Sequence, residues 1–210
     1  AFSRAVTNRG LIVETARQVI RAPAFRATDS IKALNDERFD LILITTRAFD
    51  TAVAAVQAQP FTRRGVPVVV LQNGVGGIDA AIGILGQRGL YAGVTTIPVE
   101  VRKPAVIRLL ESRGGIGLAP VDVGQDTAPI VHLFDEAGFK AQSCGDWRAM
   151  QWSKLMLSML SNAIPAILDW PMEQILANQK LCALEREAHG VNHQGALAWV
   201  RTYLERETED

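Results

Sequence analysis

The sequence has 210 residues, enough for one large domain or two modest ones, each with a buried core. Its Lys and Arg residues number 22 and so do its Asp and Glu residues, so no net charge attracts the chain to nucleic acid or to an anionic membrane. With 48% hydrophobic and 21% charged residues the composition is that of an ordinary soluble protein, and we expect neither a nucleic-acid nor a membrane partner.

Strand-like and helix-like segments alternate in the first part of the chain. Asp29 or Ser30 can cap a short helix that runs to Asp36, and two longer helices follow at residues 48–59 and 78–85. Strands are expected at residues 10–15, 24–28, 41–46 and 66–71. The last two are continuous apolar runs, typical of parallel strands covered on both faces. This order predicts an α/β fold with an open, mostly parallel sheet and helices on both faces.

The pattern changes after residue 90. A long extended stretch at 91–101 precedes strands at 105–110, 115–118 and 139–143, and Asp126 or Thr127 can cap a helix that Gly138 closes. After Asp146 the spacing is helical to the end. We therefore place a domain boundary near Gly145, with an α/β domain at 1–145 and a helical domain at 146–210.

Two strand ends carry residues suited to ligand binding, namely Thr45–Arg47 and Gln72–Gly77. Ligands of open parallel sheets bind beyond the carboxyl ends of the strands. The glycines let a backbone approach a ligand closely, and Asn73 can donate and accept hydrogen bonds. A tight turn without a ligand is the alternative, and the glycines alone favour it because such turns need glycine anyway.

The dinucleotide-binding motif G-x-G-x-x-G occurs nowhere in the sequence. Gly74-Val-Gly76 has Asp79 where the third glycine belongs. That motif holds the pyrophosphate with its backbone and with a helix N-terminus. The chain begins as though one strand–helix–strand unit preceded it, so we expect the sheet to lack its first strand and its Gly-rich loop.

A polar face marks the helix that begins near Asp146. Three- and four-residue steps align its polar residues, which are Gln151, Lys154, Ser158, Ser161 and Asn162. A solvated stripe is the alternative, but such stripes carry many long charged side chains and this one carries a single lysine. We expect Lys154 to point into a cleft and to act as a general acid, with a pKa lowered by partial burial.

The remaining residue types predict little further chemistry. The three histidines match no set of metal ligands, so we expect no metal site. Cys144 and Cys182 are interpreted as free thiols in a reducing compartment, with a disulfide as the weaker alternative. No signal peptide is recognisable, and the apolar stretch at 155–168 is too short to span a membrane. We expect a cytoplasmic protein.

Four segments resemble the ketopantoate reductase (2-dehydropantoate 2-reductase) family. They are D-L-I-L-I-T-T-R-A-F-D-T-A at 40–52, L-Q-N-G-V-G at 71–76, G-V-T-T at 93–96 and D-W-R-A-M-Q-W-S-K-L at 146–155, and their order and spacing agree over residues 1–187. The L-Q-N-G and W-x-K-L elements together are fairly specific. The resemblance implies a Rossmann-like domain followed by an all-helical domain, with NADPH and a keto acid in the cleft between them.

The resemblance also implies roles for individual residues. Lys154 of the W-x-K-L element corresponds to the catalytic lysine, and Asn73, with Gly74, lies beside the cofactor. Arg47 stands where the family often has lysine, which keeps the charge but changes its geometry. Asn162 matches a substrate-binding asparagine, whereas Ser158 replaces another asparagine. These departures support the enzyme class better than they support ketopantoate as the substrate.

The implied activity is NADP-dependent reduction of a 2-keto acid to a 2-hydroxy acid, within pantothenate biosynthesis if the substrate is ketopantoate. A homodimer stays open, as does the choice between NADP and NAD. The family's catalytic glutamate and substrate-binding serine are expected beyond Asp210, and from His189 onward the sequence departs from the family. Two alternatives remain: a non-catalytic remnant or interaction module that has lost dinucleotide binding, and another two-domain dehydrogenase with a related core.

Overall fold

The fold is taken from a computed structural model, which describes residues 2–23, 25–110, 114–170, 174 and 177–181. The side chains of Phe2, Leu157 and residues 159–165 lie outside this description. The chain divides into two compact units. The first comprises residues 1–72 and 76–147, and the second comprises residues 73–75 and 148–210. The predicted domain boundary near Gly145 stays a prediction.

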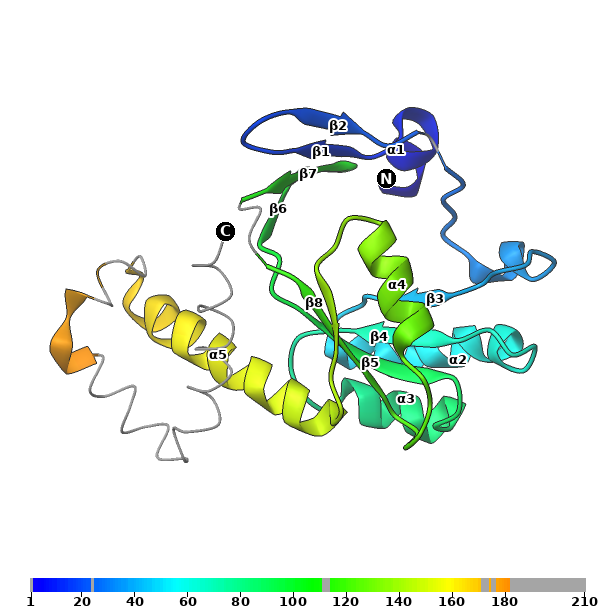
Figure 1. The fold of residues 1–210 in the computed structure, drawn as a ribbon. Coiled ribbons are helices and arrows are strands. Elements are labelled where there is room, and N and C mark those ends of the chain that lie inside the picture. The colour runs from blue at the N-terminus through cyan, green and yellow to red at the C-terminus, as the bar shows by residue number, and fades with distance from the viewer. Residues whose placement is uncertain (1, 24, 111–113, 171–173, 175–176, 182–210) are drawn as a thin grey trace. The chain divides into compact units, whose positions relative to one another are not determined.

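A five-stranded sheet organises the first unit (Figure 1). Its order is β3 (Ile42–Ile44), β4 (Val68–Leu71), β5 (Leu90–Thr95), β8 (Ile116–Pro120) and β9 (Ala141–Ser143). The first three strands are parallel to one another, β8 is antiparallel to β5, and β9 is parallel to β8. The prediction of an α/β fold with a mostly parallel sheet is confirmed. Whether a further strand and a Gly-rich loop precede this sheet stays a prediction.

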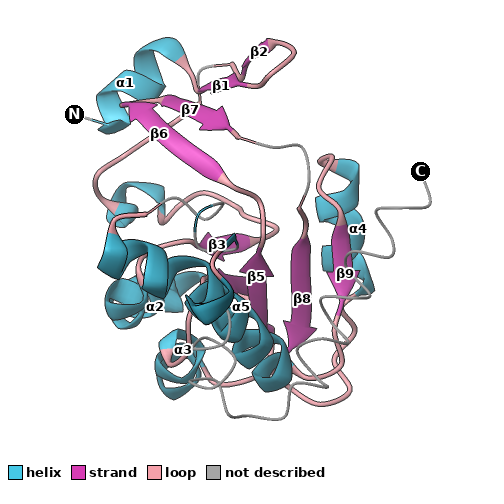
Figure 2. Cartoon of the chain, turned by 90° about the vertical axis from the view of Figure 1, so that its left-hand side faces the viewer, coloured by secondary structure: helices cyan, strands magenta, loops and turns pink. Residues whose placement is uncertain are grey.

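Helices cover both faces of this sheet. The helices α2 (Thr51–Thr62) and α3 (Gly77–Leu85) lie on one face, and α4 (Ala128–Glu136) lies on the other (Figure 2). Both faces are dry around β4, where Val68, Val69 and Val70 are all buried. On the α4 side, Val69 packs in a cluster with Tyr91, Ile116, Leu118, Ile130 and Phe134. This double coverage explains the continuous apolar runs in the sequence.

A second, four-stranded sheet was not predicted. Its order is β2 (Val19–Arg21), β1 (Ile12–Glu14), β7 (Val106–Leu109) and β6 (Val99–Lys103). The stretch expected to be extended from 91 to 101 therefore splits into β5 and β6, which belong to different sheets. Pro98 lies at the split, and its missing N–H favours a break in the ladder.

The strand expected at residues 24–28 is wrong, because residues 25–28 lie in no strand. The chain instead forms β2 earlier, as the second arm of a hairpin with β1. The Thr15 hydroxyl closes the turn between them, since it donates to the Gln18 carbonyl (2.9 Å) and accepts from the Gln18 N–H (3.0 Å). An unpredicted helix, α1 (Phe2–Arg9), precedes this hairpin and buries Val6 beside Ala105.

Three helix boundaries differ in detail from the prediction. The short helix after Ser30 is a 3₁₀ helix, η1 (Ile31–Leu34), and Ala48–Asp50 form another 3₁₀ turn, η2, before α2 begins. Pro60 does not end α2, which continues to Thr62. The start of α4 is capped as expected, because Asp126 Oδ1 accepts the Ala128 N–H at 2.9 Å.

The helix α5 (Trp147–Leu168) confirms that a helical segment follows the sheet. It ends at Asp169, whose φ of 52° lies in the left-handed region and stops the helix. The expectation of helical spacing to the end of the chain is therefore interrupted here, and residues 182–210 lie outside the described part. Among the described helices, none combines the length and hydrophobicity that crossing a membrane requires.

Candidate functional site

The carboxyl ends of β3, β4 and β5 share one edge of the five-stranded sheet, because these strands are parallel. Arg47 follows β3, and Asn73 follows β4, two residues after Leu71. Both side chains are exposed. The predicted cofactor residues therefore follow the ends of two neighbouring strands, where ligands of open sheets bind.

Gln72, for which no role was predicted, is the best-anchored side chain at this edge. It is 6% exposed, and its amide lies between the end of β3 and the start of α2. Its Nε2 donates to the Thr46 carbonyl (2.7 Å) and to the Thr51 hydroxyl (2.6 Å), which in turn donates to its Oε1 (2.9 Å). A buried amide at the end of an apolar strand was the signal in the sequence, since such a group is retained only where it finds partners.

The glycines after Gln72 are required by the turn itself. Gly74 and Gly76 have φ values of 98° and 90°, in the left-handed region. Gly77 packs against Gln72 so closely that a Cβ atom there would overlap Oε1. The alternative given for this segment, that a tight turn needs its glycines anyway, therefore accounts for all three. Any role of Gly74 in cofactor binding rests on the resemblance.

The threonines of the G-V-T-T segment also have structural partners. The Thr96 hydroxyl accepts the Gly115 N–H (2.9 Å), and the Thr96 N–H donates to the Gly115 carbonyl (3.0 Å). The Thr95 hydroxyl accepts the Ile97 N–H (3.2 Å). These bonds fix the path of the chain after β5.

The polar face of α5 is not a solvated stripe. Gln151 is only 3% exposed, and Lys154 and Ser158 are half-buried. Burial lowers the pKa of the Lys154 ammonium, because leaving water disfavours the charged form. Within the described residues no carboxylate pairs with this ammonium. Asn162 lies in α5, but its side chain is outside the described part.

The two compact units separate the predicted site residues unevenly. Asn73, Gly74, Lys154 and Ser158 belong to the second unit, because residues 73–75 group with residues 148–210. Arg47 belongs to the first unit. The loop that follows β4 thus lies in the same unit as the predicted catalytic lysine.

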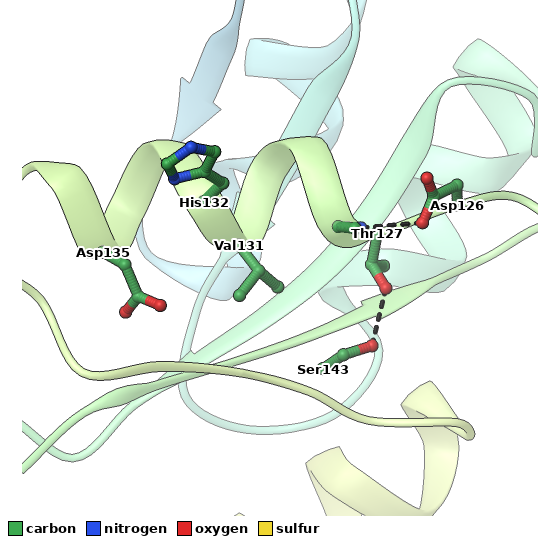
Figure 3. A pocket seen from close by; sticks show the side chains of 7 residues that line it. Asp126, Thr127, Val131, His132, Asp135 and Ser143 are labelled. Carbon is green, nitrogen blue, oxygen red and sulfur yellow. Dashed lines mark hydrogen bonds between the residues drawn. The ribbon is translucent and has the colours of Figure 1, made fainter.

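An open pocket of about 580 Å³ lies elsewhere, between α4 and β9 (Figure 3). Its polar groups already serve the fold: the Thr127 and Ser143 hydroxyls bond to each other (2.6 Å), and Asp135 Oδ1 accepts the Ala141 N–H (2.8 Å). Ser143 ends β9, which runs opposite to β5, so the pocket lies at the other edge of the sheet and contains none of the predicted site residues.

Comparison with known proteins gives a consistent result. The family model described as "Ketopantoate reductase PanE/ApbA" matches residues 2–122. A curated 2-dehydropantoate 2-reductase of Pyrococcus horikoshii is 29% identical over 187 residues. That match covers 87% of this chain and 58% of the relative, so the chain spans well under two thirds of the relative's length.

Solved structures show the same fold. The 2-dehydropantoate 2-reductase of Geobacter metallireducens superposes with a TM-score of 0.80 at 22% identity, over 88% of this chain and 61% of that one. A D-mandelate dehydrogenase solved with NADH and anilino(oxo)acetate gives 0.79 at 18% identity, over 88% and 59%. A PanE/ApbA family ketopantoate reductase of Ralstonia eutropha gives 0.76 at 26% identity, over 95% and 68%.

Proposed function

The chain belongs to the ketopantoate reductase family, and on that premise we propose that it forms part of a nicotinamide-dependent oxidoreductase that reduces a 2-keto acid to a 2-hydroxy acid. The observation that carries this proposal is the half-buried Lys154, whose pKa is lowered by desolvation, in one compact unit with the loop of Asn73.

Lys154 supplies the acid that this reaction needs. The nicotinamide cofactor supplies a hydride to the carbonyl carbon, which leaves negative charge on the carbonyl oxygen. The Lys154 ammonium stabilises that oxygen and transfers a proton to it, so the C=O group becomes CH–OH and the lysine becomes neutral. A pKa lowered towards neutrality eases this proton transfer.

The residues at the strand ends fit peripheral contacts with a cofactor. Arg47 is an exposed cation and Asn73 an exposed amide, at the edge where dinucleotides bind to open sheets. We propose that Arg47, Asn73 and Gly74 contact the cofactor and that Ser158 and Asn162 contact the substrate. The resemblance supports NADPH as the reductant and ketopantoate as a first substrate to test, which would place the protein in cytoplasmic pantothenate biosynthesis.

The test is the Lys154→Met substitution in the full-length protein that contains this chain. Methionine keeps most of the stem volume and removes both charge and proton, so we expect kcat/KM to fall roughly 10²–10⁴-fold with little change in NADPH affinity. Steady-state kinetics with ketopantoate and other 2-keto acids, with NADPH and with NADH, measures this.

Lys103→Met is the matched control, because Lys103 is an exposed lysine of β6 in the other sheet. Its turnover should equal that of the parent. Unchanged turnover of Lys154→Met on a substrate that the parent reduces well would remove Lys154 from the mechanism. A parent protein without turnover on any 2-keto acid would support the non-catalytic alternative.

A further inference from the structure

We propose that Gln72 is a positioning residue for the cofactor site, whose buried amide holds the turn of Arg47 and both ends of the Asn73 loop in fixed positions. The inference rests on the proposed function, because it assigns Gln72 a part in presenting residues 47 and 73 to the cofactor. Gln72 itself touches neither the cofactor nor the substrate in this proposal.

The first step is the link from β4 to the turn after β3. Gln72 Nε2 donates to the carbonyl of Thr46, the residue immediately before Arg47. The same nitrogen lies 3.2 Å from the Thr46 hydroxyl. A backbone carbonyl held in this way cannot rotate without losing a buried hydrogen bond, so the path of the chain into Arg47 is fixed.

The second step is the link to the start of α2. The Thr51 hydroxyl is fully buried and exchanges hydrogen bonds with both atoms of the Gln72 amide. Thr51 is the first residue of α2, four residues after Arg47. The segment from residue 46 to residue 51, with Arg47 near its start, is therefore tied to one side chain at both of its ends.

The third step concerns the Asn73 loop. The chain leaves the first compact unit after Gln72 and returns to it at Gly76, with Asn73–Val75 assigned to the second unit. Gln72 precedes this loop, and Gly77, just beyond its far end, packs against the Gln72 amide with no room for a side chain. One amide therefore holds both ends of a three-residue loop whose middle groups with the unit of Lys154.

A purely structural role for Gln72 would not need this arrangement. A buried amide offers little net stability over an apolar side chain of the same shape, because its hydrogen bonds replace bonds to water. What the amide adds is direction, since each of its atoms accepts partners only along fixed lines. Two neighbouring turns that must present groups to one ligand need such direction.

The test compares Gln72→Met with Gln59→Met. Gln59 is a half-buried glutamine of α2 whose Nε2 donates to the Ile84 carbonyl at 3.1 Å, near the far ends of α2 and α3. Both substitutions keep the side-chain volume and remove an amide that joins two elements. In the full-length protein we expect the KM for the cofactor to rise roughly ten- to hundredfold in Gln72→Met and to stay unchanged in Gln59→Met, with kcat less affected in both.

A conservative pair tests the partner. Thr51→Ser keeps the hydroxyl and should leave the cofactor KM near that of the parent, whereas Thr51→Val removes the hydroxyl at equal size and should raise the KM in the same direction as Gln72→Met. Hydrogen exchange of the 210-residue chain gives an independent readout. Gln72→Met should speed the exchange of amides at residues 46–51 and 73–77, and Gln59→Met should not.

The two proposals fail in different ways. If the parent binds cofactor and Gln72→Met binds it equally well, the positioning role is overturned and the proposed function stands. If the parent binds no nicotinamide cofactor, the proposed function fails, and hydrogen exchange alone decides whether Gln72 holds the two turns. Equal exchange in Gln72→Met and in the parent overturns the inference in either case.

Discussion

Lys154 is the residue whose electrostatics makes the sharpest prediction. Its pKa lies below the ordinary lysine value of 10.5 because half-burial desolvates the ammonium. A proton donor must be protonated, so kcat/KM should fall as the pH rises through this lowered pKa, and the fall should begin below pH 10.5. A pH–rate profile measures this. The profile of Lys154→Met should lack that limb.

The stability of the protein should change in the opposite direction over the same window. Between the lowered pKa of the folded state and 10.5, the unfolded chain keeps a proton that the folded chain has released. The free energy of unfolding contributed by Lys154 therefore increases with pH there. A fall in turnover with no fall in melting temperature identifies titration of the acid, and a profile that stays flat up to pH 10.5 contradicts the role of Lys154.

Single residues of the site were predictable only where their chemistry is unusual. A lone lysine on an otherwise apolar helix marks itself, and the structure places Lys154 half-buried on α5. Gln72 was passed over because its importance comes from three partners, Thr46, Thr51 and Gly77, that lie close to it only after β3, α2 and α3 have assembled. No local pattern encodes such a contact.

At the level of elements, α3 offers a test of close packing with a control in the same helix. Gly77 lies against the Gln72 amide and 3.2 Å, from an ideal Cβ position, from the Thr51 hydroxyl. Gly77→Ala must therefore displace a buried, hydrogen-bonded amide, and we expect a loss of about 1–3 kcal/mol in the free energy of unfolding. Urea denaturation measures the change.

Gly83, six residues along the same helix, is the control. An added Cβ atom there meets nothing within 4 Å. Gly83→Ala should increase the free energy of unfolding by about 0.5–1 kcal/mol, because alanine is the better helix former. Equal effects of the two substitutions would show that the contact between Gly77 and Gln72 carries no weight.

Elements covered on both faces were predictable, and elements that depend on distant partners were not. β4 announced itself because Val68, Val69 and Val70 are all buried, which produces an uninterrupted apolar run. The strands of the second sheet are far more exposed, with Val19 at 56% and Val101 at 69%, so they carry no hydrophobic period. Their pairing joins β1 to β7 across some ninety residues of sequence.

For the whole molecule, the question is how much of a cofactor site this chain contains. It shares its fold with a D-mandelate dehydrogenase solved with NADH, yet it spans 59% of that protein. The binding of a dinucleotide to an open sheet depends most on a Gly-rich loop and a helix N-terminus that hold the pyrophosphate. The 210-residue sequence contains no G-x-G-x-x-G segment.

We therefore expect the 210-residue chain to bind NADPH only weakly, with a dissociation constant in the millimolar range or above. Arg47 and Asn73 are exposed at the strand ends, but they offer only peripheral contacts in place of the backbone groups that grip a pyrophosphate. Titration followed by cofactor fluorescence, with calorimetry as a check, measures the affinity. The longest protein encoded in frame around this chain is the matched comparison, and it should bind far more tightly if it supplies the missing loop. Micromolar binding by the verified 210-residue chain would show that the cofactor site lies elsewhere, because the residues at this sheet edge cannot supply that affinity without a pyrophosphate cradle.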